Sequence, residues 1–391
     1  MIPRRAILCL GLSQLISWGT TYYLIGIFGD RIAGDLGWSR ELVFSGFSLA
    51  LLVMGLVSSV SGSFVDRHGG AVAMSTGSIL NAAGCLAIAA AWHPATYLAG
   101  WCLIGLGMRL SLYDAAFAAL ARIAGPEARR PMAQITLLGG LASTAFWPIG
   151  TALADALGWR GALCAYAGFA LITIPLYLPL PRGRYVSPVE REGPPATEMP
   201  MRPDRGRGAA LLYAMIVALT GFLNSGMSAH MIPILIGLGL GSAGSVSAAM
   251  LRGIGQSTAR LCDVLFGRAL HPLTLNLIST SILPIAFTIA FLAGNGWLAG
   301  AVFAFSYGAG NGLTTITRGS LPLVLFDHRD YGRTAGRLVA PSFLLAAIAP
   351  LSYAYVISSW GEHGALWLSL MLAALTVCAA LFLKLLYHRA R

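Results

Sequence analysis

The chain has 391 residues, of which 57% are apolar and only 10% are charged, and its mean hydropathy is +0.73. Soluble proteins carry about 25% charged residues, so this composition excludes a water-soluble enzyme. Basic residues outnumber acidic ones by 26 to 15. The single lysine, Lys384, lies outside any G-x-x-x-x-G-K-[ST] phosphate-binding loop, which excludes an ATP-driven pump built from this chain alone.

Apolar runs long enough to span a membrane, about 20 residues each, recur along the whole chain. The first follows a basic N-terminus without a small-residue cleavage site, so we expect an uncleaved helix and not a signal peptide. The fold class that we predict is an all-α integral membrane protein with twelve transmembrane helices. Their expected limits are 6–29, 41–64, 71–92, 95–121, 132–154, 160–181, 209–236, 243–264, 272–293, 297–321, 335–358 and 364–387.

A polar segment divides these helices six and six. Residues 182–208 are rich in Pro, Gly and charge and cannot form a packed core. A shift of 203 residues along the sequence places Gly-Ala-Leu at 161–163 on the same tripeptide at 364–366, which favours an internal duplication. We therefore predict three parts, which are an N-terminal six-helix bundle at 1–181, a cytoplasmic linker at 182–208 and a C-terminal six-helix bundle at 209–391.

The placement of arginine predicts the topology, because cytoplasmic loops of membrane proteins carry an excess of basic residues. With a cytoplasmic N-terminus, only Arg31, Arg40 and Arg160 fall in outer loops, and most other basic residues fall in cytoplasmic segments. Both termini are then cytoplasmic. The strong preference for Arg over Lys is typical of GC-rich bacterial genes, so we expect a bacterial inner membrane.

Residues 62–70, between the second and third expected helices, read GSFVDRHGG. This stretch resembles the G-x-x-x-D-R-x-G signature of major facilitator superfamily transporters, and the resemblance extends over the whole chain. It implies the major facilitator fold, with two pseudo-symmetric six-helix bundles, and a loop that latches the cytoplasmic side and takes part in gating. A degenerate counterpart follows the eighth helix. The gating residues implied are Gly62, Asp66, Arg67 and Gly69, with Asp263 and Arg268 in the counterpart.

Within the superfamily, three features are similar to bacterial relatives of the monocarboxylate transporters. They are DLGWS at 35–39, HMIPIL at 230–235, and Arg260 at the position of a substrate-binding arginine. Gln256 departs from the pattern, because many of these carriers have an acid four residues before that arginine. Trp147 precedes Pro148 where antiporters have glycine. If protons drive transport, a different group must carry them.

Four arginines lie inside expected helices, where a charge costs roughly 2.5–3.5 kcal/mol on insertion scales. Arg109, Arg252, Arg260 and Arg318 are therefore candidates to bind an anion. The alternative for each is structural: pairing with a nearby acid, capping helix carbonyls or reaching the membrane surface. For Arg109 the nearest acid is Asp114, but a five-residue step places the two about 140° apart on a continuous helix. We therefore expect these two side chains not to pair.

Two titratable residues are candidate proton carriers. Asp114 is the only acid well inside an expected helix, and burial disfavours a bare carboxylate. His230 belongs to the residue type whose charge changes near neutral pH. The alternatives are that Asp114 pairs with an arginine of a neighbouring helix and that His230 is simply hydrogen-bonded.

Further polar residues in the expected helices are candidates to contact substrate, or else to pack or to lock helices together. They are Tyr22, Tyr23, Asn224 and Asn311. The six cysteines are scattered without a C-x-x-C pattern, which predicts neither disulfides nor a metal site. We expect no metal and no cofactor.

These features predict a secondary active transporter that moves a small, carboxylate-like organic anion, coupled to protons, by alternating access. The alternative is an exporter of neutral or amphiphilic compounds in which the arginines are structural. We find no H-E-x-x-H or G-x-S-x-G motif and no paired acids in the helices, so we do not expect an enzyme. The sequence does not exclude a channel or a sensor. The expected partners are an anionic small molecule and the lipid bilayer, not nucleic acid, and the expected state is a monomer.

Overall fold

The computed structural model describes residues 2–185, 203–267, 270–292, 296–326 and 331–388. Contacts divide the chain into two compact units. Unit 1 comprises residues 1–185 and 328–340, and unit 2 comprises 186–327 and 341–391. The predicted domain limits at 181 and 208 stay a prediction, and the start of the last helix lies with unit 1.

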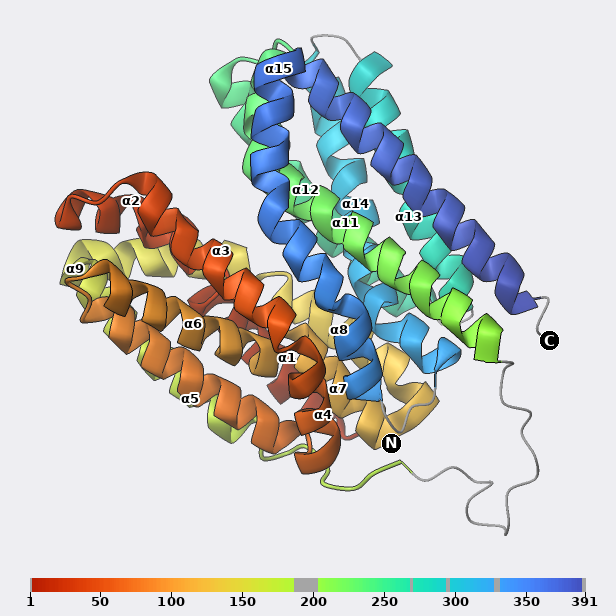
Figure 1. Cartoon of the computed structure of the whole chain (residues 1–391), viewed down its shortest axis with the longest axis horizontal. Coiled ribbons are helices and arrows are strands. Elements are labelled where there is room, and N and C mark those ends of the chain that lie inside the picture. The colour runs from red at the N-terminus through yellow and green to blue at the C-terminus, as the bar shows by residue number, and fades with distance from the viewer. Residues whose placement is uncertain (1, 186–202, 268–269, 293–295, 327–330, 389–391) are drawn as a thin grey trace. The chain divides into compact units, whose positions relative to one another are not determined.

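Every secondary-structure element of the described residues is helical (Figure 1). Unit 1 contains α1 (Arg4–Thr20), α2 (Leu24–Leu36), α3 (Arg40–Leu56), α4 (Ser58–His68), α5 (Gly70–Ala89), α6 (Pro94–Ser111), α7 (Tyr113–Ala124), the 3₁₀ helix η1 (Gly125–Ala128), α8 (Arg129–Gly139), α9 (Ala142–Leu176) and the first residues of α15 (Tyr331–His388).

Several expected spans of unit 1 are interrupted helices. The first expected span is divided into α1 and α2, and the second into α3 and α4, which are bent by 58° at Val57. The fourth divides into α6 and α7 at Leu112. Between the fifth and sixth expected spans, α9 changes direction at Gly158, whose φ of 67° lies in the left-handed region that glycine tolerates.

Local sequence accounts for two of the turns in unit 1. The Ser39 side chain accepts a hydrogen bond from the N–H of Leu42 at 3.2 Å and so caps α3. His93 Nδ1 accepts the N–H of Ala95 at 3.1 Å, and Pro94 occupies the first turn of α6, where its missing N–H is harmless. Both caps stand where the sequence analysis places loops.

Unit 2 contains α11 (Pro203–Gly237), α12 (Ser242–Phe266), α13 (Pro272–Leu292), α14 (Trp297–Leu325) and the rest of α15, which is kinked at Gly361. Glycines let α12 and α14 approach closely. A Cβ on Gly255 would collide with the carbonyl of Phe305, and one on Gly308 with the carbonyl of Arg252. Small residues at a helix contact are typical of membrane bundles.

Six helices or helix runs in the described residues are long and apolar enough to cross a membrane, or seven if α3 and α4 form one bent span. The twelve expected spans stay a prediction. Some of these helices cover more than one expected span. The longest, Tyr331–His388, has 58 residues and contains the last two expected spans on either side of the kink at Gly361.

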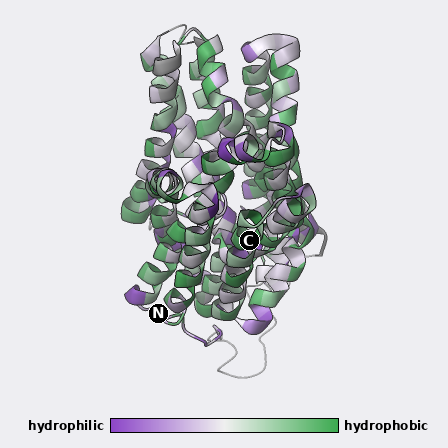
Figure 2. Cartoon of the chain, turned by 90° about the vertical axis from the view of Figure 1, so that its left-hand side faces the viewer, coloured by the Kyte–Doolittle hydropathy of each residue, from purple (hydrophilic) through white to green (hydrophobic). Residues whose placement is uncertain are grey.

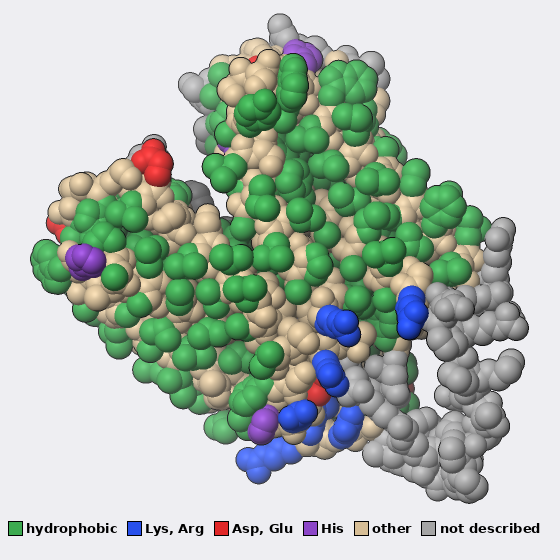
Figure 3. Space-filling model, viewed as in Figure 1, with side chains coloured by type: hydrophobic (Ala, Val, Ile, Leu, Met, Phe, Trp, Pro, Cys, Tyr) green, Lys and Arg blue, Asp and Glu red, His purple; other side chains and the backbone are tan. Residues whose placement is uncertain are grey.

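The outer surface of the helices is apolar. Hydrophobic residues run along the helices in Figure 2, and hydrophobic side chains cover much of the face in Figure 3. Soluble monomers rarely expose contiguous apolar patches larger than a few hundred Å², so this surface fits contact with lipid tails. Large apolar side chains that are at least 70% exposed include Leu56, Val60, Leu178, Phe266 and Leu351.

Candidate functional site

Arg109 and Asp114 form an ion pair at the interruption between α6 and α7. Leu112 has φ −80° and ψ −172°, which is extended backbone. Arg109 Nη1 lies 3.2 Å from Asp114 Oδ2, and the two side chains are 3% and 18% exposed. The expectation that these residues do not pair was wrong. The separation of about 140° applies to a continuous helix, and the break at Leu112 removes it.

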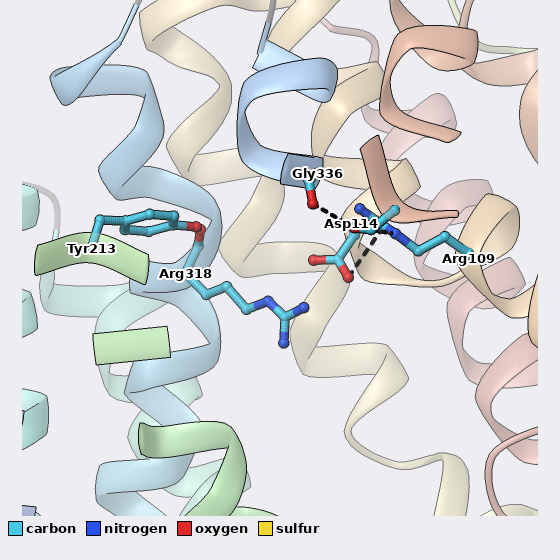
Figure 4. A network of polar contacts seen from close by, with 6 residues as sticks. Arg109, Asp114, Tyr213, Arg318 and Gly336 are labelled. Carbon is cyan, nitrogen blue, oxygen red and sulfur yellow. Dashed lines mark hydrogen bonds and ion pairs between the residues drawn. The ribbon is translucent and has the colours of Figure 1, made fainter. Parts of the chain in front are cut away.

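The same guanidinium is hydrogen-bonded to a second interrupted helix. Arg109 Nε donates to Ser58 Oγ at 3.0 Å, and the Ser58 hydroxyl donates to the carbonyl of Gly336 in α15 (Figure 4). Gly336 has to be small here, because a Cβ would collide with the carbonyl of Ser58. Arg109 thus joins α6, the start of α4, α7 and the first part of α15 within unit 1.

Two buried amides that the sequence analysis missed contact the same break. Gln14 Nε2 donates to the Ser111 carbonyl at 2.8 Å, and Asn81 Nδ2 donates to Ser111 Oγ at 2.9 Å. Gln14 is fully buried and Asn81 is 1% exposed. The available signal was an amide side chain in the middle of an otherwise apolar span, since most buried polar groups have at least one hydrogen-bond partner.

Tyr22 and Tyr23 lie at the interruption between α1 and α2, next to other aromatic rings. The Trp18 ring is 4.9 Å from Tyr22 and 5.0 Å from Tyr113, between ring centroids. Tyr22 also meets Phe47 edge-on at 5.0 Å. Both tyrosines are half-buried. The geometry agrees with aromatic packing, and a role as a wall for substrate stays a prediction.

The loop motif at 62–70 contacts the N-terminus of α15. The Asp66 carboxylate accepts the N–H of Gly332 at 3.0 Å and that of Arg333 at 2.8 Å. A carboxylate at a helix N-terminus is stabilised by the unpaired N–H groups and the helix dipole. Gly62 approaches Gly332 so closely that a Cβ would collide with its carbonyl.

The other members of the motif are placed differently. Gly69 has φ +86°, a left-handed conformation that ends α4 and favours glycine. Arg67 is exposed in the last turn of α4. In the expected counterpart, Asp263 is buried near the end of α12, where its Oδ1 occupies the space that a Cβ on Gly267 would need. Arg268 lies outside the described residues.

Arg252 and Asn224 come together in unit 2. Arg252 Nη2 donates to Asn224 Oδ1 at 2.7 Å and to Ser228 Oγ at 2.9 Å. Its guanidinium carbon also lies 5.3 Å from the centre of the Tyr307 ring, within cation–π range. This arginine therefore joins α12 to α11 and α14.

Arg260 is 2% exposed and reaches α14. Its Nε lies 3.4 Å from the Gly312 carbonyl and its Nη2 lies 3.3 Å from Thr315 Oγ1. The Thr315 hydroxyl donates to the carbonyl of Asn311 at 3.1 Å. Thr315 thus links the Arg260 guanidinium to the backbone of Asn311. Asn311 itself is half-buried.

Arg318 and His230 also have neighbours within unit 2. The Arg318 guanidinium carbon lies 5.1 Å from the centre of the Phe343 ring, and its carbonyl accepts the Tyr213 hydroxyl at 2.7 Å (Figure 4). His230 Nε2 lies 2.9 Å from the carbonyl of Pro350, so this nitrogen carries the hydrogen. The imidazole is also nearly parallel to the Tyr353 ring, with 6.1 Å between the ring centroids.

Comparisons with known proteins agree with this architecture. A family model described as Major Facilitator Superfamily matches residues 10–336. Among solved structures, the human organic anion transporter MFSD10 (TETRAN) is similar with 17% identity and a TM-score of 0.71, covering 96% of this chain and 99% of that one. The proton:xylose symporter XylE is similar with 14% identity and a TM-score of 0.73, covering 97% and 94%.

A third solved structure, the transporter FucP in an outward conformation, is 13% identical with a TM-score of 0.72, covering 98% of this chain and 99% of that one. No curated protein sequence matched the chain. The solved structures share the fold, but their sequence identities are too low for their substrates to be assigned to this chain. The family match confirms the expected resemblance to the superfamily, and with it a multi-pass membrane protein that transports small molecules and is not an enzyme. The resemblance to bacterial monocarboxylate transporters stays a prediction. The chain belongs to the Major Facilitator Superfamily.

Proposed function

We propose that the protein is a secondary active transporter that moves a small organic anion with a carboxylate-like group, coupled to protons, by alternating access. One observation carries the proposal: two arginines are almost fully buried inside apolar helices, Arg109 with 4% and Arg260 with 2% of the surface exposed. A charge buried in a membrane protein has to be offset by a partner or to serve a ligand. A carboxylate is the ligand that a guanidinium binds best.

Arg260 in unit 2 is one of the two arginines that we propose as partners of the substrate carboxylate. Its hydrogen bonds with Gly312 and Thr315, at 3.4 and 3.3 Å, are longer than the 2.7–2.9 Å of a charge-assisted bond. A carboxylate would form shorter, charge-assisted bonds with the same guanidinium. Arg252, with Asn224 and Ser228, supplies a second cationic site in the same unit. Arg318, Asn311 and the Tyr22–Tyr23 pair remain proposed substrate contacts.

In unit 1, the Arg109–Asp114 pair supports a coupling step. The Asp114 carboxylate is paired with the Arg109 guanidinium, in the way that a substrate carboxylate would be. Transfer of one proton from water to Asp114 neutralises the acid and releases Arg109 to a substrate anion. Loss of that proton on the other side restores the ion pair and expels the anion. One proton and one monovalent anion then cross together without net charge, and His230 is the alternative carrier.

The proposed subfamily, location and topology rest on the sequence. The stretches 35–39 and 230–235 favour a relative of the bacterial monocarboxylate transporters. We further propose that the chain is a monomer in a bacterial inner membrane with both termini in the cytoplasm.

The second candidate function is export of neutral or amphiphilic compounds. It is favoured by the contacts of Arg109 with Asp114 and of Arg252 with Asn224, which give both arginines a structural role. Thermal-shift screening of purified protein at two pH values separates the two functions. Stabilisation by organic anions that strengthens at lower pH supports the first, and stabilisation by uncharged amphiphiles alone supports the second.

The decisive experiment is uptake of a panel of radiolabelled monocarboxylates into proteoliposomes. We expect Arg260→Ala and Arg109→Ala to lower uptake by about 10- to 100-fold, the equivalent of the 1.5–3 kcal/mol of a hydrogen bond to a charged group. The matched control is Arg31→Ala, which removes an exposed arginine paired with Asp155 in unit 1. Unchanged uptake by folded Arg109→Ala and Arg260→Ala protein would contradict the proposal.

A further inference from the structure

We propose that Gln14 is a positioning residue that holds the helix break at Leu112 and thereby keeps Asp114 against Arg109. The proposal concerns the structure of unit 1, and its consequence for coupling rests on the proposed function. Gln14 lies on α1 and acts on the pair through the backbone of Ser111.

The break changes the partners of the backbone. In a continuous helix, the carbonyl of Ser111 would accept the N–H of Ala115. In the structure, that N–H donates to the carbonyl of Leu112 at 3.0 Å, and the N–H of Ala116 donates to the same oxygen at 3.2 Å. The Ser111 carbonyl, buried in the bundle, needs a different donor. Gln14 Nε2 provides it at 2.8 Å.

The local sequence does not account for the break. Residues 110–113 read Leu-Ser-Leu-Tyr, with neither proline nor glycine, the residues that most often interrupt helices. Contacts from other helices must therefore hold it. Besides Gln14, the amide of Asn81 donates to the Ser111 hydroxyl. On the far side of the break, the Tyr113 hydroxyl donates to the carbonyl of Thr136 at 3.3 Å.

The break has a simple alternative, in which the N–H of Ala115 returns to the Ser111 carbonyl. The helix then runs on without interruption, and a five-residue step turns Asp114 about 140° away from Arg109. The ion pair cannot survive that rotation. By donating to the Ser111 carbonyl, Gln14 gives this buried oxygen a partner in the broken helix and so favours the geometry in which the acid and the arginine meet.

A double-mutant cycle tests this inference without measuring transport. The Tm is measured for Arg109→Gln, Asp114→Asn and the double variant, first in the wild-type background. Because the two side chains interact, we expect their effects on Tm to be non-additive. In a Gln14→Met background, which keeps the length of the side chain and removes its amide, we expect the non-additive part to disappear. In a Ser13→Ala background we expect it to remain.

Ser13 is the matched control because it is fully buried on the same helix, and its hydroxyl bonds to the carbonyl of Leu10 and not to the break. A distance measurement gives a second readout. Spin labels at Ala99 on α6 and Glu127 after α7, both exposed, flank the break. In a background without the native cysteines, Gln14→Met should shift this distance and Ser13→Ala should not.

Persistence of both the non-additivity and the distance in Gln14→Met would overturn the inference. If that variant does not fold, Gln14→Asn replaces it, since it keeps an amide but is one methylene too short to reach Ser111. The expected result is the same loss. Failure of the proposed function would leave these two readouts intact, whereas failure of this inference would leave anion uptake intact, so the two outcomes are distinguishable.

Discussion

At the scale of single residues, unit 1 contains charged side chains that are buried or that link one helix to another. One such charge, Arg160, lies between the rings of Trp92 and Trp159, with its guanidinium carbon 4.0 and 4.1 Å from their centres. Its Nη1 donates to Asp35 Oδ2 at 2.7 Å, and the Trp159 Nε1 donates to the same oxygen at 3.0 Å. These bonds tie the end of α2 to α9, and Asp35 lies outside the expected membrane spans.

The hydrogen bonds from Trp159 and Arg160 lower the pKa of Asp35. A carboxyl group whose pKa is lower in the folded state stabilises the fold above its unfolded pKa of about 4, and this stabilisation is lost as the pH falls through the folded value. We therefore expect Asp35→Asn to have a lower Tm than the wild type at neutral pH, and the two curves to start converging at about pH 4 and to meet once the pH is below the lowered pKa. A difference in Tm that is independent of pH would contradict this.

Asp114→Asn tests the coupling step directly. The amide can neither release nor take up a proton, so we expect downhill exchange of the anion to continue while accumulation driven by a pH gradient is lost. The measurement is the accumulation ratio in proteoliposomes with and without an imposed pH gradient. Asp155→Asn, at an exposed acid paired with Arg31, is the control and should accumulate normally. Full accumulation by Asp114→Asn would assign the proton to a different residue.

The sequence predicts the candidate charges better than their pairing. Arg109, Arg260 and Asp114 stand out because they interrupt apolar runs, and insertion energetics alone mark them. Their partners depend on the backbone at Leu112, where the local sequence has no helix breaker. Gln14 and Asn81 were missed although their amides stand in apolar spans, and the carbonyl that Gln14 binds becomes a target only once the helix is broken.

At the scale of helices, end contacts and close approaches decide the packing. The N-terminus of α15 is capped by Asp66, and the contact between α12 and α14 depends on glycines. Both features are local enough to be tested by one substitution with a neighbouring control.

We expect Asp66→Ala to destabilise the protein by about 0.5–2 kcal/mol, the range for loss of a helix cap. The physical reason is that the N–H groups of Gly332 and Arg333 lose their carboxylate acceptor. Thermal unfolding of Asp66→Ala is compared with that of Arg67→Ala, whose side chain is exposed in the same motif. Equal Tm values for the two variants would show that the cap is energetically unimportant.

Two glycines on α12 form a matched pair. A Cβ on Gly255 would collide with the Phe305 carbonyl, whereas one on Gly253 meets open space. We expect Gly255→Ala to destabilise by about 1–3 kcal/mol, the range for overpacking. Gly253→Ala should be neutral or stabilising by up to about 1 kcal/mol, because alanine favours the helix. Thermal unfolding measures both, and a stabilising Gly255→Ala would contradict the close contact.

The position of some helix ends follows from the sequence, and that of others does not. Gly158 and Gly361, both with φ of 67°, lie in the gaps expected between spans, at 155–159 and 359–363. Glycine in such a gap signals a turn. The breaks at Val57 and Leu112 fall inside expected spans, because hydropathy reports burial in lipid and carries no information on a local change of backbone direction.

At the scale of the whole molecule, the distribution of charge bears on the topology of the chain in the membrane. Lys and Arg side chains gather at one end of the helices in the view of Figure 3. Composition and the motif at 62–70 were sufficient to predict a helical transporter of the Major Facilitator Superfamily. The substrate class could not be read in the same way, since it depends on which side chains line one site, and that is a property of packing.

The proposed topology predicts which loops a membrane-impermeant reagent can reach. In a background without native cysteines, we expect His93→Cys, in an outer loop, to react with an impermeant maleimide in intact cells. Glu127→Cys, in a cytoplasmic loop, should react only after permeabilisation. Both positions are exposed, so access to the reagent is matched. The reverse pattern of labelling would invert the topology.

The hydrogen bond between Gln14 and Ser111 also has a consequence for how this protein can change over evolution. A proline at position 113 would suit the first turn of α7 and the extended backbone of Leu112 before it. Such a helix would stay broken without help, and the amide of Gln14 would become dispensable. We therefore expect positions 14 and 113 to change together in evolution. The glutamine can be lost only after a different feature, such as proline at position 113, keeps the helix broken.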